Sequence, residues 1–299
     1  MGRLIECVPN FSEGRRKKVV ERIVESITLV KGIRVLDCSC DAAHNRSVVT
    51  FVGEPEAVKK AAFGAVKTAA KLINMERHRG EHPRIGAADV VPLIPLSGTT
   101  MEQCVILARE LGAEIAEKLK IPVYLYEEAA FSADRRNLAA VRRGEYEGLK
   151  KAMELPARRP DFGPSRPHPT AGATAVGARP PLIAYNINLD SSDLQIARAI
   201  ARSIRGSSGG YPGVKALGIF IEESATAQVT INLCNYREIS LAQLFERVKG
   251  EAALRGVGIG SSEIVGLVPA EALIDTAAAY LRLQGFHPGQ VLEKRMAEE

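Results

Sequence analysis

The chain has 299 residues, of which 46% are hydrophobic and 25% are charged, and these proportions are typical of a folded globular protein. The formal net charge is only +5, and no basic run alternates with aromatic residues. The composition therefore argues against a nucleic-acid-binding protein and suits small anionic ligands. No apolar stretch approaches the roughly 20 residues of a membrane-spanning helix, which argues against an integral membrane protein.

The amino terminus and the cysteines indicate in which cellular compartment the protein is expected. The opening stretch, MGRLIECVPNFSEG, lacks the apolar centre of a signal peptide. The cysteines are odd in number and widely scattered, which does not suit a disulfide framework. We therefore expect a cytoplasmic protein whose cysteines are small, buried, apolar side chains, namely Cys7, Cys38, Cys40, Cys104 and Cys234.

Strands and helices alternate through the first part of the chain. Pro55 is tolerated where a helix begins, because the amide it lacks would have no partner there. Thr100 and Gln103 form the pattern of a helix-capping box. Apolar periodicity predicts, in chain order, a strand at 4–11, a helix at 15–32, strands at 32–41 and 46–53, a helix at 55–73, a strand at 88–96 and a helix at 101–120.

The same order begins again near residue 182. Ser192 with Gln195, and Ser240 with Gln243, have the capping-box pattern. The periodicity predicts a strand at 182–189, a helix at 196–204, strands at 213–223 and 227–234, a helix at 240–254, a strand at 263–269 and a helix at 271–283.

The two halves read as a duplication, since EIVGLVP at 263–269 nearly repeats DVVPLIP at 89–95. The order β-α-β-β-α-β, found twice, is the ferredoxin-like pattern. We predict an α/β (α+β) protein of two duplicated ferredoxin-like subdomains, each an open mixed sheet with helices on one face. The subdomains are expected at residues 1–178 and 179–299, the second with a short charged tail. The other face of each sheet needs a cover, from the other subdomain or from a second copy in a dimer.

The joint between the halves, residues 145–181, is rich in Pro, Gly and Arg. A stretch of this kind and length is either a linker or a binding loop. Its density of Gly, Ser, Thr, His and Arg favours a binding loop.

Residues 78–95, HRGEHPRIGAADVVPLIP, contain the most informative local pattern. The corresponding stretch of the second half is LRGVGIGSSEIVGLVP, which keeps the Arg-Gly pair, the turn glycines and the acidic residue. It has no equivalent of Glu81, His82, Pro83 or Arg84. Residues needed only to make the turn should recur in both halves, so their single occurrence points to chemistry.

Three interpretations fit this stretch. It has the H-x-x-E-H spacing of a zinc peptidase, but that site needs a continuous helix, which Gly80 and Pro83 oppose. It also fits a polar turn without chemistry. Finally, His82 fits an acid–base residue, because histidine exchanges protons near neutrality, Pro83 restricts its backbone and Arg84 is suited to an anionic substrate. The spacing alone does not separate the last two.

Long segments of the chain resemble glutamate formimidoyltransferases, folate-dependent enzymes of histidine degradation. The resemblance covers nearly the whole chain and is carried by ECVPNFSEGR at 6–15, RHRGEHPRIGAADVVPLIP at 77–95, PVYLYEEAA at 122–130, RRGEYEGL at 142–149 and DFGPSRPHPTAGATAVGAR at 161–179.

The resemblance implies that the protein moves a formimino group from N-formimino-L-glutamate to N5 of tetrahydrofolate, the co-substrate. It implies two similar α/β subdomains with a groove between them, a homodimer and no metal. It implies His82 as the catalytic histidine. It also implies a folate-binding set made of Gly163, Pro164, Ser165, Arg166, Pro167, His168, Pro169, Thr170, Ala171, Gly172 and Arg202.

Arg166, Pro167, His168 and Ala171 depart from the animal enzymes and resemble the microbial ones, which leaves their folate contacts less defined. The match at Arg202 is carried by a weaker motif. The sequence contains no deaminase part, so transfer alone is expected.

Other assignments remain open at this stage. The chain also fits formyl exchange with 5-formyltetrahydrofolate or N-formylglutamate, or a folate-binding relative without catalysis. His44 has no counterpart in the second half and is a candidate, with Arg84, for lining the substrate groove. His78 and His287 are expected at the surface. GSSGGYPG at 206–213 lacks the ending of a phosphate-binding loop and is expected to be a flexible connection.

Overall fold

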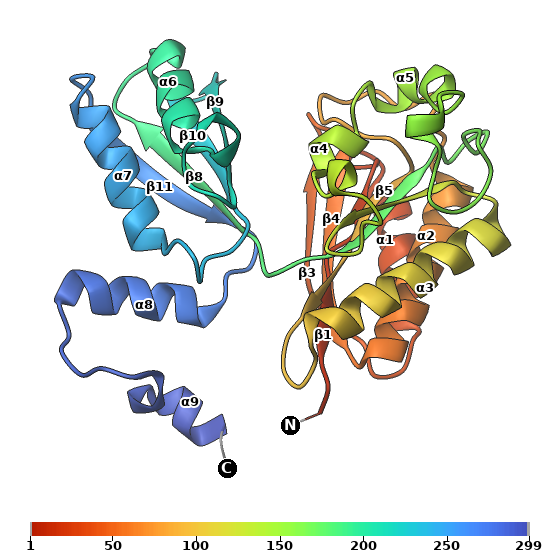
Figure 1. Cartoon of the computed structure of the whole chain (residues 1–299), viewed down its shortest axis with the longest axis horizontal. Helices are drawn as coiled ribbons and strands as arrows, with labels where there is room; N and C mark the ends of the chain where they lie inside the picture. Colours follow the sequence, from red (N-terminus) through yellow and green to blue (C-terminus); the bar gives the residue numbers. More distant parts are fainter. Residues whose placement is uncertain (1, 298–299) are drawn as a thin grey trace. The chain divides into compact units, whose positions relative to one another are not determined.

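The computed structural model describes residues 2–297. The chain divides between Pro180 and Pro181 into two compact units (Figure 1). Each unit has its own hydrophobic core. We call residues up to 180 unit 1 and the residues after it unit 2. Among the described residues, no helix is both long and apolar enough to cross a membrane.

Unit 1 contains seven strands and the helices that pack on them. The strands are β1 (Ile5–Cys7), β2 (Asn10–Phe11), β3 (Arg34–Asp41), β4 (Arg46–Gly53), β5 (Ala88–Pro95), β6 (Val123–Glu127) and β7 (Thr174–Ala178). The helices are α1 (Lys17–Thr28), α2 (Pro55–Leu72), α3 (Met101–Leu119), α4 (Leu138–Val141) and α5 (Glu145–Ala152), with short 3-10 turns at Ala133–Arg135 and Pro156–Arg158.

The sheet of unit 1 runs β3, β4, then β1 and β2 side by side along β4 and β5, then β5, β7 and β6. The first part is antiparallel and has the predicted ferredoxin-like order. The predicted first strand is split at Pro9, which has no N–H for the ladder. β7 and β6 extend the sheet in parallel, which makes it mixed.

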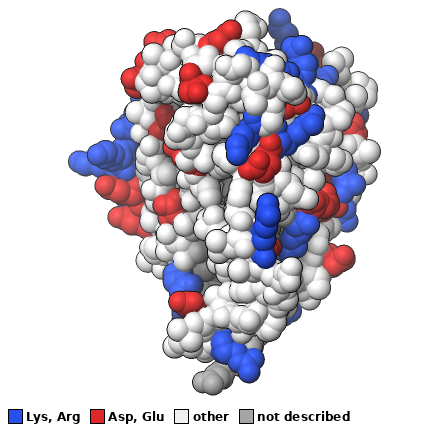
Figure 2. Space-filling model, turned by 90° about the vertical axis from the view of Figure 1, so that its left-hand side faces the viewer, with Lys and Arg blue, Asp and Glu red and all other residues white. Residues whose placement is uncertain are grey.

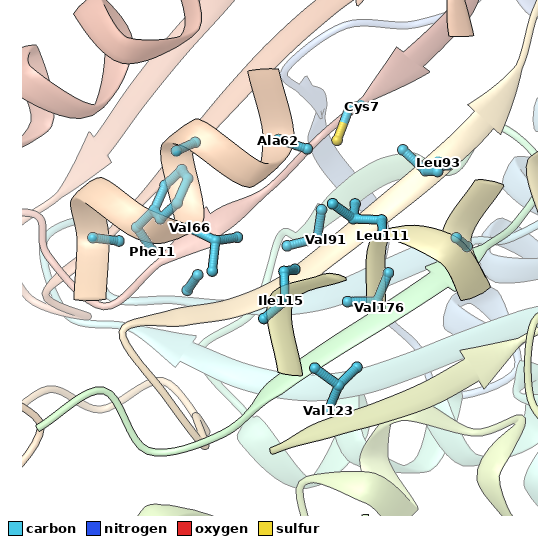
Figure 3. Packing of buried hydrophobic residues seen from close by; sticks show 14 of the residues in the cluster. Cys7, Phe11, Ala62, Val66, Val91, Leu93, Leu111, Ile115, Val123 and Val176 are labelled. Carbon is cyan, nitrogen blue, oxygen red and sulfur yellow. The ribbon is translucent and has the colours of Figure 1, made fainter. Parts of the chain in front are cut away.

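Helices α1, α2 and α3 pack on one face of this sheet and enclose the main core (Figure 3). Ala62 and Val66 of α2 and Leu111 and Ile115 of α3 point at the strands. The small residues of α2 let it approach the sheet closely, and burial of the larger side chains stabilises this layer by roughly 1.5–3 kcal/mol each.

Part of the opposite face of the sheet is covered within unit 1. Val141 of α4 and Leu149 of α5 pack with Tyr124 and Tyr126 of β6 in a second cluster. The joint predicted to be a loop therefore contributes α5 and β7 to the fold. Its remaining stretch, residues 159–173, is irregular apart from isolated bridges.

Unit 2 is a smaller α/β layer with four strands. The strands are β8 (Ile183–Leu189), β9 (Val214–Ile221), β10 (Thr226–Leu233) and β11 (Ile259–Val265), in the order β11-β8-β10-β9 and antiparallel throughout. The helices are α6 (Leu194–Ile204), α7 (Leu241–Ala253), α8 (Ala270–Leu281) and α9 (Leu292–Ala297), with 3-10 turns at Gly206–Ser208 and Pro288–Gln290. This order is again ferredoxin-like, as predicted.

Two of the three predicted capping boxes are present, at Thr100 and at Ser240. The third is wrong: α6 is capped by Asp193, whose carboxylate accepts the N–H of Gln195 at 2.7 Å. Strand β11 ends at Val265, so the GLVP half of the predicted strand is not in the sheet.

The cysteines do not all have the predicted burial. Cys7 and Cys104 are buried, but Cys38 and Cys40 are exposed and Cys234 is intermediate. The reason lies in β3, which is the edge strand of its sheet and has no neighbour beyond it. Burial of the residues on an edge strand depends on what covers it, and the strand pattern alone does not reveal that.

Candidate active site

Several loops of unit 1 converge at one end of its sheet, around a small hollow of about 10 Å³. That volume is room for roughly one water molecule. The converging loops include residues 8–16, 41–46 and 76–87. The hollow is lined by Asn10, Phe11, Ser12, His44, Asn45, Arg46, His78, His82, Arg84 and Asp89.

The stretch 78–87, here the His82 turn, is not helical. A Cβ on Gly80 would lie 2.2 Å from the carbonyl oxygen of His44, so this glycine allows the turn to pack against the neighbouring loop. The helical face required by the zinc interpretation is therefore not formed by His78 and His82.

His78 is buried, which corrects the expectation that it lies at the surface. Its Nδ1 accepts a hydrogen bond from Arg84 Nε at 3.2 Å, because an arginine can only donate. The other ring nitrogen, Nε2, then carries the hydrogen and donates to the carbonyl of Asn45 at 3.0 Å. Burial and the nearby Arg84 charge lower the pKa of His78, so it is a neutral structural residue with both nitrogens occupied.

Arg84 is buried and holds the His82 turn against α5. Its Nη1 donates to Glu145 at 2.6 Å and to Glu147 at 2.9 Å, and its Nη2 donates to Glu147 at 2.6 Å. The backbone carbonyl of Arg84 also accepts the N–H of Tyr146 at 2.8 Å. Arg84 was a candidate for binding a substrate carboxylate, but these internal carboxylates already occupy its guanidinium.

His82 lines the hollow and is half-buried. Burial, followed by the positive charges of Arg46 and Arg142, lowers its pKa to about 3. A hydrogen bond to the backbone of Pro83 acts in the opposite direction but is weaker. The ring is therefore neutral at physiological pH, which is the form that accepts a proton.

Two arginines supply the positive charge near His82. Arg46 Nε donates to Asn10 Oδ1 at 2.9 Å, and Arg142 is paired with the buried carboxylate of Asp89. Burial and the charge of Arg142 lower the pKa of Arg46, so the two cations repel one another. The buried Nε of Arg142 has no hydrogen-bond partner among the described residues. Close cations with unused donors favour an anionic ligand.

His44 lies beside His82, with 6.3 Å between the ring centroids and 73° between the ring planes. Its Nδ1 is 2.6 Å from Asp41 Oδ2. The structure thus brings together two of the histidines that the sequence singled out.

Residues 163–172 of unit 1 form an irregular loop that contacts the His82 turn at Gly86. His168 organises its second half, because its Nδ1 accepts the N–H groups of Thr170 at 3.3 Å and Ala171 at 3.0 Å. Gly163 and Gly172 have positive φ, of 89° and 71°, which favours glycine at both positions. Of the other residues of the loop, Ser165, Arg166 and Pro169 are exposed and Pro164 and Pro167 are partly buried.

Backbone pairing joins this loop to the His82 turn. Gly86 and Gly172 form an isolated antiparallel bridge, and the N–H of Ala87 donates to the carbonyl of Ala171 at 2.9 Å. A Cβ on Gly86 would lie 1.9 Å from the carbonyl oxygen of Ala173. Only glycine permits this approach, so the two candidate segments are held together as one assembly.

Three of the remaining candidates are exposed. Arg202 is exposed on α6 of unit 2. His287 is exposed, as expected, and Glu81 is exposed with no resolved contact to His82 among the described residues. The predicted flexible connection at 206–213 contains the 3-10 turn Gly206–Ser208.

No pattern in the sequence had pointed to four residues around His82, namely Asn10, Arg46, Asp89 and Arg142. Three of these residues lie in segments that carried the family resemblance: Asn10 in ECVPNFSEGR, Asp89 in the segment at 77–95 and Arg142 in RRGEYEGL. That resemblance was the available signal. Arg46 had none beyond its place next to the 41–45 turn.

Comparison with known proteins decides the family. Residues 4–179 match the model of the formiminotransferase domain, N-terminal subdomain, and residues 184–293 match the model of the formiminotransferase domain. The chain belongs to the formiminotransferase family.

Relatives in this family match nearly the whole chain. "Glutamate formimidoyltransferase" of Streptococcus pyogenes serotype M1 is 44% identical over 297 residues, which cover 99% of each chain. The protein of the same name from Thermoplasma acidophilum is 50% identical over 295 residues, covering 98% of this chain and 97% of the relative. "Formimidoyltransferase-cyclodeaminase" of Mus musculus is 45% identical over 94% of this chain, which corresponds to 53% of the mouse protein.

Proposed function

We propose that the protein transfers the formimino group of N-formimino-L-glutamate to N5 of tetrahydrofolate, giving 5-formiminotetrahydrofolate and L-glutamate. The observation that carries this proposal is the identity of 44% and 50%, over nearly the full chain, to two proteins named glutamate formimidoyltransferase. Formyl exchange and binding without turnover have no such support.

His82 is the proposed acid–base residue. Its neutral ring accepts the proton that N5 loses when it attacks the formimino carbon. The reactants gain from being held in line, because orientation removes several kcal/mol from the barrier of a two-substrate reaction. The hollow has room for only one small group, which suits the transferred carbon and its nitrogen rather than a whole substrate.

Arg46 and Arg142 are the proposed partners of a glutamate carboxylate, in place of Arg84. They lie close enough to His82 to lower its pKa, whereas the donors of Arg84 serve Glu145 and Glu147. Binding of the anionic donor would offset both positive charges and raise the pKa of His82. The ring would then become a better proton acceptor only when the substrate is present.

The 163–172 loop is the proposed tetrahydrofolate site, and its pairing with the His82 turn would bring N5 to the histidine. Arg202 remains a further prediction for folate binding. We also propose that residues 1–178 and 179–299 act as the two subdomains of a cytoplasmic homodimer. The partners would be small molecules rather than nucleic acid, and on the face drawn in Figure 2 acidic side chains lie among the basic ones.

The test is a steady-state assay of glutamate release with tetrahydrofolate and each donor, N-formimino-L-glutamate and N-formyl-L-glutamate. We expect turnover with the formimino donor, and we expect Arg46→Gln to raise KM for that donor more than KM for tetrahydrofolate. Arg166→Ala should have the reverse effect. No turnover with the formimino donor, at any tetrahydrofolate concentration, would contradict the proposed function.

A further inference from the structure

His44 is exposed, but its contacts suit an acid–base residue. Asp41 contacts it twice: Oδ1 accepts the backbone N–H of His44 at 2.9 Å, and Oδ2 lies 2.6 Å from the ring Nδ1. Burial would raise the pKa of Asp41, but the hydrogen bonds from His44 outweigh it and lower the pKa, so the carboxylate is ionised. An ionised carboxylate only accepts, so Nδ1 carries the hydrogen and Nε2 is the nitrogen left for chemistry.

The ring of His44 shares the hollow with His82. The centroids are 6.3 Å apart, and the planes meet nearly edge to face. Two hydrogen bonds placed end to end span on the order of 6 Å, so both rings can reach substituents of a single carbon placed beside them. The side chain of His44 is 45% exposed, which leaves it accessible to a substrate.

Resting on the proposed function, we propose that His44, oriented by Asp41, is a second acid–base residue of the transfer and protonates the departing glutamate nitrogen. His82 takes the proton from N5 in the same cycle. A carboxylate that fixes the tautomer of a histidine and accompanies its positive charge is a recurring device in acid–base catalysis.

The transfer needs one proton acceptor for N5 and one proton donor for the departing glutamate nitrogen. N5 of tetrahydrofolate adds to the carbon of the protonated formimino group, a C–N5 bond forms, and the N5 hydrogen passes to His82. The tetrahedral adduct then collapses: the bond between the carbon and the glutamate nitrogen breaks as that nitrogen receives a proton from the His44 imidazolium. His82 ends protonated and His44 neutral, and exchange with solvent restores both.

A single histidine would have to take the first proton and deliver it to a different nitrogen. The cations near His82 oppose its protonated form, so a separate proton donor relieves it of the second task. The charged groups that line the hollow or act on its two histidines are Asp41, Arg46, Arg84, Asp89 and Arg142. Among the described residues, Asp41 is the charged group within hydrogen-bond distance of the ring of His44.

A purely structural role is the alternative, since Asp41 and His44 also close the turn between β3 and β4. Arg15 provides a matched control, because its Nε donates to the carbonyl of Ala42 in the same turn at 2.8 Å. Arg15→Ala loosens this turn without touching either ring.

The experiment measures kcat/KM for formimino transfer against pH in the wild type, His44→Gln, Asp41→Asn and Arg15→Ala. We expect a bell-shaped profile for the wild type. The profile of His44→Gln should lack the alkaline limb, and its kcat/KM at neutral pH should be lower by a factor of about 10²–10³. Asp41→Asn should displace the alkaline limb. In a further variant, His44→Ala, added imidazole should restore part of the activity, whereas it should not do so in Arg15→Ala. Circular dichroism checks that each variant is folded.

A bell of unchanged shape in His44→Gln, together with no rescue by imidazole, would overturn the second acid–base role while leaving the transfer activity established. An inactive wild type would instead overturn the proposed function on which that role rests. The two failures are therefore distinguishable.

Discussion

Arg84 and Glu147 form a two-point ion pair that ties the His82 turn to α5. Nη1 lies 2.9 Å from Oε2 and Nη2 lies 2.6 Å from Oε1, while the same guanidinium also donates to Glu145 and His78. The fork of an arginine matches a carboxylate at two points, which a lysine cannot do. This arrangement makes Arg84 a positioning residue for His82.

Replacing Arg84 should therefore affect both stability and rate. We expect Arg84→Met to lower the free energy of unfolding by about 1–3 kcal/mol, because it leaves His78 and two glutamates without their partner. Arg84→Lys should recover only part of this loss. Urea denaturation measures the effect, and Arg22→Ala, which breaks an exposed pair with Glu25, should change it by under about 0.5 kcal/mol. Equal effects of the Arg84 and Arg22 changes would contradict the positioning role.

The approach of Gly86 to Ala173 predicts a cost for any side chain there. A Cβ would lie 1.9 Å from one backbone carbonyl and 2.6 Å from another, so Gly86→Ala should destabilise the protein by about 1–3 kcal/mol and raise KM for tetrahydrofolate. Gly250→Ala in α7 is the matched control. It meets nothing within 4 Å and should stabilise the helix by about 0.5–1 kcal/mol. Thermal unfolding of both variants measures these two opposite changes in stability.

The low pKa of His82 gives a pH dependence of stability with a definite sign. In the unfolded chain a histidine titrates near ~6.5, whereas in the folded protein burial and Arg46 hold the pKa of His82 at about 3. Between these two pH values the unfolded state binds a proton that the folded state does not. The contribution of neutral His82 to the free energy of unfolding is therefore complete above about pH 6.5 and is lost as the pH falls towards 3.

The slope should reach about 1.4 kcal/mol per pH unit from this residue. His82→Gln should flatten the dependence of the unfolding free energy on pH between 4 and 6, as measured by denaturant titration. His287→Gln, at an exposed position, should not change it. Parallel curves for the wild type and His82→Gln would mean that His82 titrates normally.

The cysteines should fall into reactive and protected classes. Cys38 and Cys40 are exposed on β3, and Cys7 and Cys104 are buried in the core. Burial raises the pKa of Cys38 to about 11, so its alkylation should be slow at neutral pH and accelerate as the pH rises. Mass spectrometry after iodoacetamide treatment should find Cys7 and Cys104 unmodified until the protein unfolds. Their modification in the native protein would contradict the packing of unit 1.

The duplication made most of the fold predictable, because a repeated apolar pattern marks the same strand twice. β6 and β7 were both missed, and β7, with the sequence TAVGA, is short and lies in a stretch dominated by Gly and Pro. Burial of His78 was also missed. It depends on Asn45, which is far away in the sequence, and on a hydrogen bond from Arg84. Local patterns indicate which face of an element is apolar, but they do not reveal which polar side chains find partners across the fold.

The assembly around His82 illustrates the same limit. The His82 turn could be singled out because its residues 81–84 have no equivalents in the second half of the chain. Arg46 and Arg142 are 96 residues apart in the sequence, and no local pattern relates them. Only the folded unit brings both charges to the same histidine.

The most direct test of the central claim is a single-turnover measurement with N-formimino-L-glutamate labelled with ¹³C in the formimino carbon, saturating tetrahydrofolate and excess enzyme. In His82→Gln, transfer of the label to folate should be slower by about 10²–10⁴, with the affinity for tetrahydrofolate unchanged. Transfer at the wild-type rate in that variant would contradict the account and leave the His82 turn as a structural feature.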